Sequence, residues 1–185
     1  DLAGIFDIKK SDNDFKVKSG DNIGFKQTMH APQGMIALTG ARIITMNGDK
    51  VIENGVLLTD GKHIKAVGTA AEVTIPKGAK VVDVSGKTIM PGIVDAHAHG
   101  SQASNEIVPQ QNWKNFAGLA LGVTTIHDPS NDTTEIFAAS EMQKAGTIVG
   151  PRIFSTGTIL YGANGPGYTS HVDSLDDAKF HLERL

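Results

Sequence analysis

Three apolar, β-rich runs begin thirty residues apart in the second half of this 185-residue chain, at Ile93, Val123 and Ile153. The segments between them favour helices, with polar capping residues at their beginnings and glycine at their ends. Strands and helices that alternate at this period are typical of the βα units of a parallel α/β fold. Residues 88–185 therefore predict three such units.

Helices are predicted over 112–121, from Asp132 or Thr133 to Lys144, and from Ser174 to Leu185. An open sheet of three parallel strands leaves its edges unpaired. A closed (β/α)8 barrel needs about 200–250 residues, more than residues 88–185 provide. We therefore expect the first three βα units of an incomplete (β/α)8 TIM barrel. Such a segment should be unstable alone. Its exposed apolar faces should be covered by another copy in a homo-oligomer or by the missing remainder of the chain.

The segment before residue 88 has a different rhythm. Strands are predicted over 35–39, 41–46, 51–53, 56–59, 63–68, 73–76 and 80–84. Asn47-Gly48, Asn54-Gly55 and Asp60-Gly61 are turn signals between them. Short strands at roughly ten-residue spacing predict an incomplete β-sandwich domain over 36–87. Residues 1–35 are weakly patterned and are interpreted as a junction or the end of a preceding segment.

Composition excludes several classes of protein. Seventeen Lys and Arg against twenty Asp and Glu give a formal net charge of -3, which argues against a nucleic-acid binder. No apolar run approaches the ~18 residues of a membrane helix. The chain has no cysteine, so disulfides, thiolate ligands and cysteine nucleophiles are excluded. Because the sequence opens at Asp1 without a leader pattern, we expect a processed product or a piece of a longer protein.

A His-x-His pair ends the first strand of the α/β region. On a strand, His97 and His99 project from one face, with Asp95 one step earlier on that face. Two imidazoles about 7 Å apart can converge on one divalent cation. Such a pair can also simply end a strand, but the apolar strand and the acidic residue on the same face favour a metal site. The pair would lie at the carboxyl-terminal end of the strand, where α/β enzymes place their active sites.

Two further segments supply candidate substrate contacts. His127 and Asp128 close the second strand, either as substrate or metal-site contacts or as a strand end turning into a helix; adjacent residues point to opposite faces, which favours the turn. Tyr168 and His171 lie in the Gly-rich segment 162–171, which follows the third strand as a binding loop or as a mobile connector.

The run Pro91–Gly100 resembles the first-strand signature of the amidohydrolase superfamily. Residues 40–87 are similar to that superfamily's composite, urease-like β-sandwich, and residues 122–126 resemble its second barrel strand. The imidazolonepropionase-like and prolidase-like amidohydrolases are the most similar subgroup. Some members of that kind carry a Tol-type β-propeller before the barrel, which would make residues 1–35 the junction.

The resemblance implies that His97 and His99 bind one or two divalent metal ions, usually zinc. The superfamily completes its site with a Lys or Glu on strand four, His on strands five and six, and Asp on strand eight, which have no counterpart here. The isolated chain is therefore expected to be inactive. The implied reaction of the intact protein is hydrolysis of an amide, cyclic amide or dipeptide C–N bond in a small molecule or short peptide. The compartment stays open between periplasm and cytoplasm, and the lack of cysteine with the propeller junction mildly favours the periplasm.

A different class of function remains open from the residues alone. A non-catalytic β-sandwich module with a partial α/β segment would bind a partner or a carbohydrate and need no metal. Such a module has no reason to carry Asp95, His97 and His99 in phase, so this set discriminates between the two hypotheses.

Overall fold

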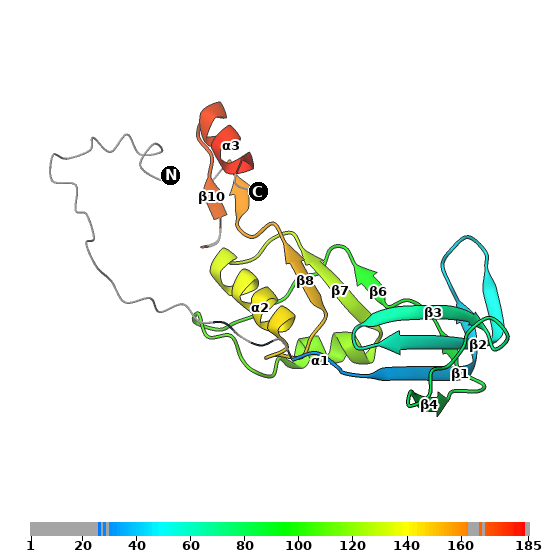
Figure 1. The fold of residues 1–185 in the computed structure, drawn as a ribbon. Helices are drawn as coiled ribbons and strands as arrows, with labels where there is room; N and C mark the ends of the chain where they lie inside the picture. Colours follow the sequence, from blue (N-terminus) through cyan, green and yellow to red (C-terminus); the bar gives the residue numbers. More distant parts are fainter. Residues whose placement is uncertain (1–25, 27, 29, 163–166, 168, 184–185) are drawn as a thin grey trace.

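The computed structural model describes residues 26, 28, 30–162, 167 and 169–183 (Figure 1). The described residues form a five-stranded sheet, a three-stranded parallel sheet with two helices, and a two-stranded sheet with a third helix. In Figure 1 these lie on the right, in the centre and above the centre, respectively. None of the described helices is long and apolar enough to span a membrane. The β-rich part of the sequence thus forms the first sheet, and the alternating part forms the three-stranded sheet with its helices.

The first sheet is mixed and has the strand order β3-β2-β1-β4, with β5 also paired to β1. Its strands are β1 (Met35–Ile44), β2 (Val51–Asp60), β3 (His63–Thr69), β4 (Lys80–Asp83) and β5 (Thr88–Ile89). β1 is antiparallel to β2 and parallel to β4 and β5. Buried apolar side chains form two clusters, one around Ala37, Val56 and Leu58 and one around Ala41, Ile43 and Ile52.

Three sequence predictions in this sheet are wrong in detail. β1 and β2 run through the expected breaks, because Gly40 (φ 81°) and Asn54 (φ 50°) take left-handed conformations at irregularities in the pairing and not in hairpin turns. The expected strand 73–76 is a loop. Val73 donates its backbone N–H to the Thr69 carbonyl (3.1 Å) and buries its side chain in the first cluster, so its apolar character serves packing and not strand pairing.

The second sheet confirms the thirty-residue alternation. Its parallel strands, in the order β6-β7-β8, are β6 (Ile93–Asp95), β7 (Val123–Asp128) and β8 (Arg152–Ser155). The helices between them are α1 (Trp113–Ala120), which packs against β7, and α2 (Thr133–Ala145), which packs against β8. Asn112 and Asp132 cap the two helix beginnings with their side chains, and Gly146 (φ 74°) ends α2.

One face of this sheet is covered and the other is open. Ile153 and Ile126 pack against α2 with Ile136 and Ala139. The prediction that β6 is buried is wrong for the described residues, because its side chains are exposed. The exposed large apolar side chains of β6 and of the neighbouring elements are Ile93, Val94, Trp113, Phe116, Phe137 and Phe154. The cause is that β6 is an edge strand and that no described element covers the face carrying Val94 and Phe154.

The last described segment contains two strands that the sequence did not predict. β9 (Ile159–Tyr161) lies just before the segment 162–171 that was interpreted as a loop, and it pairs in parallel with β10 (Thr169–His171), which lies inside that segment. α3 (Leu175–Leu182) follows and confirms the predicted helix beginning, since Ser174 and Asp177 form a reciprocal capping box. Hydrogen bonds from Ser174, led by that of its hydroxyl, hold the pKa of the Asp177 carboxyl below its usual value.

Replacing Gly40 by Ala should destabilise the first sheet, because a Cβ there would collide with the Ser85 hydroxyl in addition to straining a left-handed backbone. We expect the free energy of unfolding to fall by more than the roughly 1–2 kcal/mol of the backbone strain alone. Gly48→Ala is the matched control, since Gly48 is also left-handed (φ 57°) with nothing within 4 Å of its Cβ position. Urea unfolding measures both, and equal losses would contradict the close approach to Ser85.

Candidate functional site

His97 and His99 lie just beyond the last residue of β6. The strand ends at Asp95, whose carboxylate Oδ1 accepts a hydrogen bond from the backbone N–H of His97 (3.1 Å) and so stabilises the turn. The ring centroids of the two histidines are 4.9 Å apart and the ring planes are inclined at 72°. The two rings are therefore brought together by a turn, edge towards face, and not as successive positions on one face of a strand.

The turn carrying the histidines is attached to the neighbouring strand. The Ala98 N–H donates to the His127 carbonyl (2.9 Å), which extends the β6–β7 contact past the end of the ladder. Since β6 and β7 are parallel, this contact keeps both histidines at the carboxyl-terminal edge of the sheet. Ligand sites of open α/β sheets and of barrels lie at this edge.

Asp128 is the residue of the site that the sequence reasoning missed, because it was interpreted as a turn residue. It ends β7 and is only 1% exposed. Its Oδ1 accepts from the Ser130 backbone N–H (3.0 Å), and its Oδ2 accepts from the Asn131 side-chain amide (2.8 Å). That amide also donates to the Gly100 carbonyl (3.0 Å). The buried carboxylate thus connects the loop after β6 to the loop after β7. The signal in the sequence was a single acidic residue ending an apolar strand.

The two nitrogens of the His99 ring have different surroundings. Nδ1 lies 3.2 Å from the Ser130 hydroxyl oxygen and 3.6 Å from Asp128 Oδ1, while the side chain as a whole is 55% exposed. Nε2 therefore lies at the edge of the ring that faces away from these groups. A depression adjoins the ring and is lined by His99, Gly100, Ser101, Ser130, Asn131, Asp132 and Glu135.

The donor set fits a divalent metal in part. Two imidazoles, one of them oriented through its other nitrogen by a hydroxyl and a carboxylate, are typical of histidine ligation. Within the described residues there is no group of three or more His, Cys, Asp or Glu side chains placed to hold a metal. His97 and His99 could thus supply two of the ligands of a tetrahedral site, and no described cluster supplies the rest.

Among the described residues, no side-chain hydrogen bond or ring contact joins the predicted substrate-contacting residues to this pair. His127 is half-buried in β7 and directly precedes Asp128, so the two side chains point to opposite faces of the strand. His171 ends β10 and its Nε2 lies 2.6 Å from Asp173 Oδ1; it does not line the depression at His99. Tyr168 lies outside the described residues.

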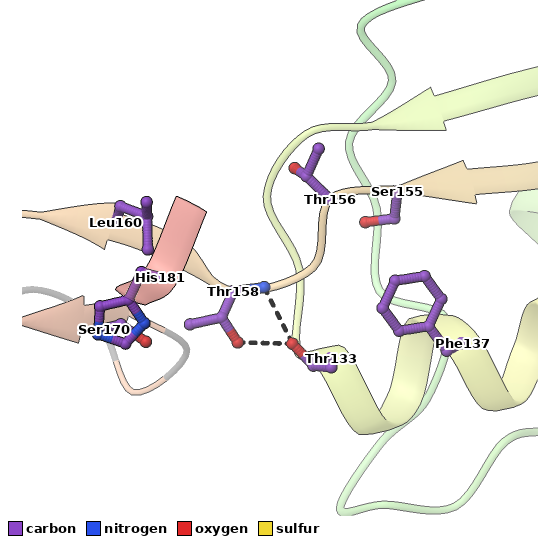
Figure 2. A pocket seen from close by; sticks show the side chains of 8 residues that line it. All are labelled: Thr133, Phe137, Ser155, Thr156, Thr158, Leu160, Ser170 and His181. Atoms are coloured by element: carbon purple, nitrogen blue, oxygen red, sulfur yellow. Dashed lines mark hydrogen bonds between the residues drawn. The ribbon is translucent and has the colours of Figure 1, made fainter. Parts of the chain in front are cut away.

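A second depression lies between α2, the end of β8 and the β9–β10–α3 segment (Figure 2). Its lining is rich in hydroxyl groups and consists of Thr133, Phe137, Ser155, Thr156, Thr158, Leu160, Ser170 and His181. Figure 2 shows the Thr133 hydroxyl meeting both the Thr158 hydroxyl (2.6 Å) and the Thr158 backbone N–H (3.0 Å). These contacts attach the start of β9 to the start of α2, and neither His97 nor His99 is part of this lining.

The chain is similar to known hydrolases. No family model matches it. It is 39% identical over 167 residues to the imidazolonepropionase of Bacillus cereus strain G9842, covering 89% of this chain and 30% of the relative. The imidazolonepropionase of Bacillus thuringiensis strain Al Hakam is 38% identical over the same length. The chain thus spans about 30% of the length of the curated relatives it matches.

Solved structures give the same indication. A putative prolidase from Bifidobacterium longum has a TM-score of 0.67 and 26% identity, covering 82% of this chain and 39% of that one. Phenylurea hydrolase B has a TM-score of 0.56 and 28% identity, covering 71% and 32%. A protein described as an amidohydrolase has a TM-score of 0.63 at 18% identity, covering 80% and 43%, a likeness of fold alone.

Replacing Asn131 by Ala should loosen the two loops at this edge of the sheet, because Asp128 Oδ2 and the Gly100 carbonyl both lose a donor. We expect a loss of about 1–3 kcal/mol in the free energy of unfolding, the usual cost of leaving a buried polar group unpaired. Thr134→Ala, at an exposed position on α2, is the control and should change stability by less than about 0.5 kcal/mol. Thermal unfolding with unchanged midpoints for both variants would contradict the bridging role of Asn131.

Proposed function

This chain belongs to the amidohydrolase superfamily, and on that premise we propose that it forms part of a metal-dependent hydrolase of carbon–nitrogen bonds. The observation that carries the proposal is the convergence of the His97 and His99 rings at the carboxyl-terminal edge of a parallel sheet. The names of its relatives support the reaction class, since they include imidazolonepropionases and a putative prolidase. We infer an amide, cyclic amide or dipeptide bond in a small molecule or short peptide as the substrate.

We propose that residues 88–185 are the first three βα units of a (β/α)8 barrel. The strand order β6-β7-β8 follows the sequence, as in a barrel, and does not reverse as in a doubly wound sheet. The open face carrying Val94 and Phe154 would then turn to the barrel interior. Residues 36–87 would form part of a β-sandwich beside it, and residues 1–35 a junction to a preceding segment.

The site residues have separate roles in this proposal. His97 and His99 would hold the cation, zinc by preference, which when bound supplies a Lewis acid and lowers the pKa of a water molecule. Asp95 supports the turn that carries His97, and Ser130 orients the His99 ring. No described residue is assigned the proton transfer.

The remaining polar groups of the edge would contact substrate. The depression beside His99 offers hydroxyl, amide and carboxylate groups to a polar substrate. We also propose substrate contacts outside this depression, through His127, Tyr168 and His171. Further ligands and the general base would have to come from outside the described residues, from a further segment or a second copy of the chain.

The chain should bind zinc through the two imidazoles. His97→Ala and His99→Ala should each weaken binding by well over tenfold, because each removes a direct ligand, while outer groups alone account for about 10- to 100-fold. His63→Ala, at the exposed beginning of β3, is the matched control and should leave binding unchanged. Equilibrium dialysis with zinc measures this, and equal binding by all four proteins would refute the proposed site.

The same zinc-loaded chain should not hydrolyse cyclic-amide or dipeptide probes by itself, because the pair supplies only part of a coordination shell. Release of amine, followed with and without a chelator, is the measurement. Chelator-sensitive turnover by the isolated chain would contradict the requirement for further ligands.

A further inference from the structure

The two imidazoles of the site are held in different ways. His97 is placed through its backbone, by the hydrogen bond to Asp95, and its ring contacts the ring of His99. The His99 ring is held through its own Nδ1, which faces Ser130 and the buried Asp128. We propose that Asp128 is a positioning residue that keeps the proton of neutral His99 on Nδ1 and thereby presents the Nε2 lone pair to the cation. The role of Nε2 rests on the proposed function.

The burial of Asp128 makes its charge effective. The residue is 1% exposed, so its carboxylate is shielded from bulk water, and its Oδ1 lies 3.6 Å from Nδ1 of the ring. A neutral imidazole carries N–H on one nitrogen and a lone pair on the other. A negative charge beside Nδ1 attracts an N–H there and repels a lone pair. The geometry thus favours the Nδ1–H form, in which the lone pair is on Nε2 at the opposite edge.

The Ser130 hydroxyl is compatible with this form but does not select it. A hydroxyl group can accept from Nδ1–H or donate to an Nδ1 lone pair, so its 3.2 Å contact permits either tautomer. Asp128 places this hydroxyl as well, because it accepts the Ser130 backbone N–H (3.0 Å). The carboxylate charge therefore selects the tautomer of His99, and the Ser130 hydroxyl adapts its own hydrogen bond to that tautomer.

The carboxylate has little freedom to move away from the ring. Each of its oxygens accepts a hydrogen bond, from the Ser130 N–H and the Asn131 amide, and Asn131 is itself bound to the Gly100 carbonyl directly after His99. The loop that carries the ligand and the loop that carries the carboxylate partners are thus bound to each other. A shift of either loop would change the distance from Asp128 to Nδ1.

The test is the tautomer of His99 in the metal-free chain, read from the nitrogen chemical shifts of ¹⁵N-labelled histidine at about pH 8.5, above the ordinary imidazole pKa. The His99 signals are assigned by their loss in His99→Ala. In the unmodified chain we expect N–H on Nδ1 and a lone pair on Nε2. An Nε2–H tautomer in the unmodified chain would overturn the proposal without any variant.

Three variants separate charge from shape. Asp128→Asn should move His99 towards the Nε2–H form and weaken zinc binding by about 10- to 100-fold. Ser130→Ala keeps the charge and should keep the Nδ1–H form. Glu141→Gln removes an exposed charge from α2, away from the depression beside His99, and should change neither the tautomer nor zinc binding. Circular dichroism shows whether each variant keeps its fold; if Asp128→Asn loses it, the unmodified chain and Ser130→Ala decide.

The outcomes distinguish this inference from the proposed function. If Asp128→Asn folds, keeps the Nδ1–H form and binds zinc as the unmodified chain does, the positioning role is refuted while the metal site stands. If the unmodified chain binds no zinc but its tautomer depends on Asp128, the metal site is refuted while the effect of the carboxylate on the ring is upheld. A tautomer that changes in Ser130→Ala alone would assign the selection to the hydroxyl and overturn the role given to Asp128.

Discussion

Parallel pairing of β6, β7 and β8 is the constraint on which the candidate site depends. Because the three strands point the same way, the segments that leave their carboxyl ends emerge at one edge of the sheet. The turn carrying His97 and His99 therefore meets the segment that begins at Asp128. The Ala98–His127 hydrogen bond shows the contact at the level of the backbone. Without this pairing the two histidines would be neighbours in sequence but would have no carboxylate behind them.

The buried carboxylate is the costly part of this arrangement, and its hydrogen bonds explain how it is tolerated. An ionised group removed from water destabilises a fold unless it is paired and hydrogen-bonded. Asp128 accepts from Ser130 and Asn131, and no buried side-chain polar atom of the described residues lacks a partner. A fully satisfied polar network of this kind rigidifies the segments it joins. Rigid placement is what a metal ligand such as His99 requires.

Local signals in the sequence predicted the elements, and contacts between distant residues decided what was missed. The thirty-residue period and the caps at Asp132 and Ser174 were sufficient to place β6, β7, β8 and the beginnings of α2 and α3. The role of Asp128 was missed because it depends on a ring that lies far away in sequence and on burial that one strand cannot reveal. The exposure of Val94 was missed for the same reason: an apolar strand predicts a buried face, but the elements that would bury it must exist elsewhere.

The claim that His97 and His99 bind one cation is tested most directly by X-ray diffraction from crystals of the chain grown with zinc, recorded on both sides of the zinc absorption edge. We expect an anomalous peak within bonding distance of a nitrogen of each ring, about 2.0–2.1 Å from each. The peak should lie on the Nε2 side of His99, with Nδ1 still directed at Asp128. A peak bound by other residues, with none between these two rings, would contradict it.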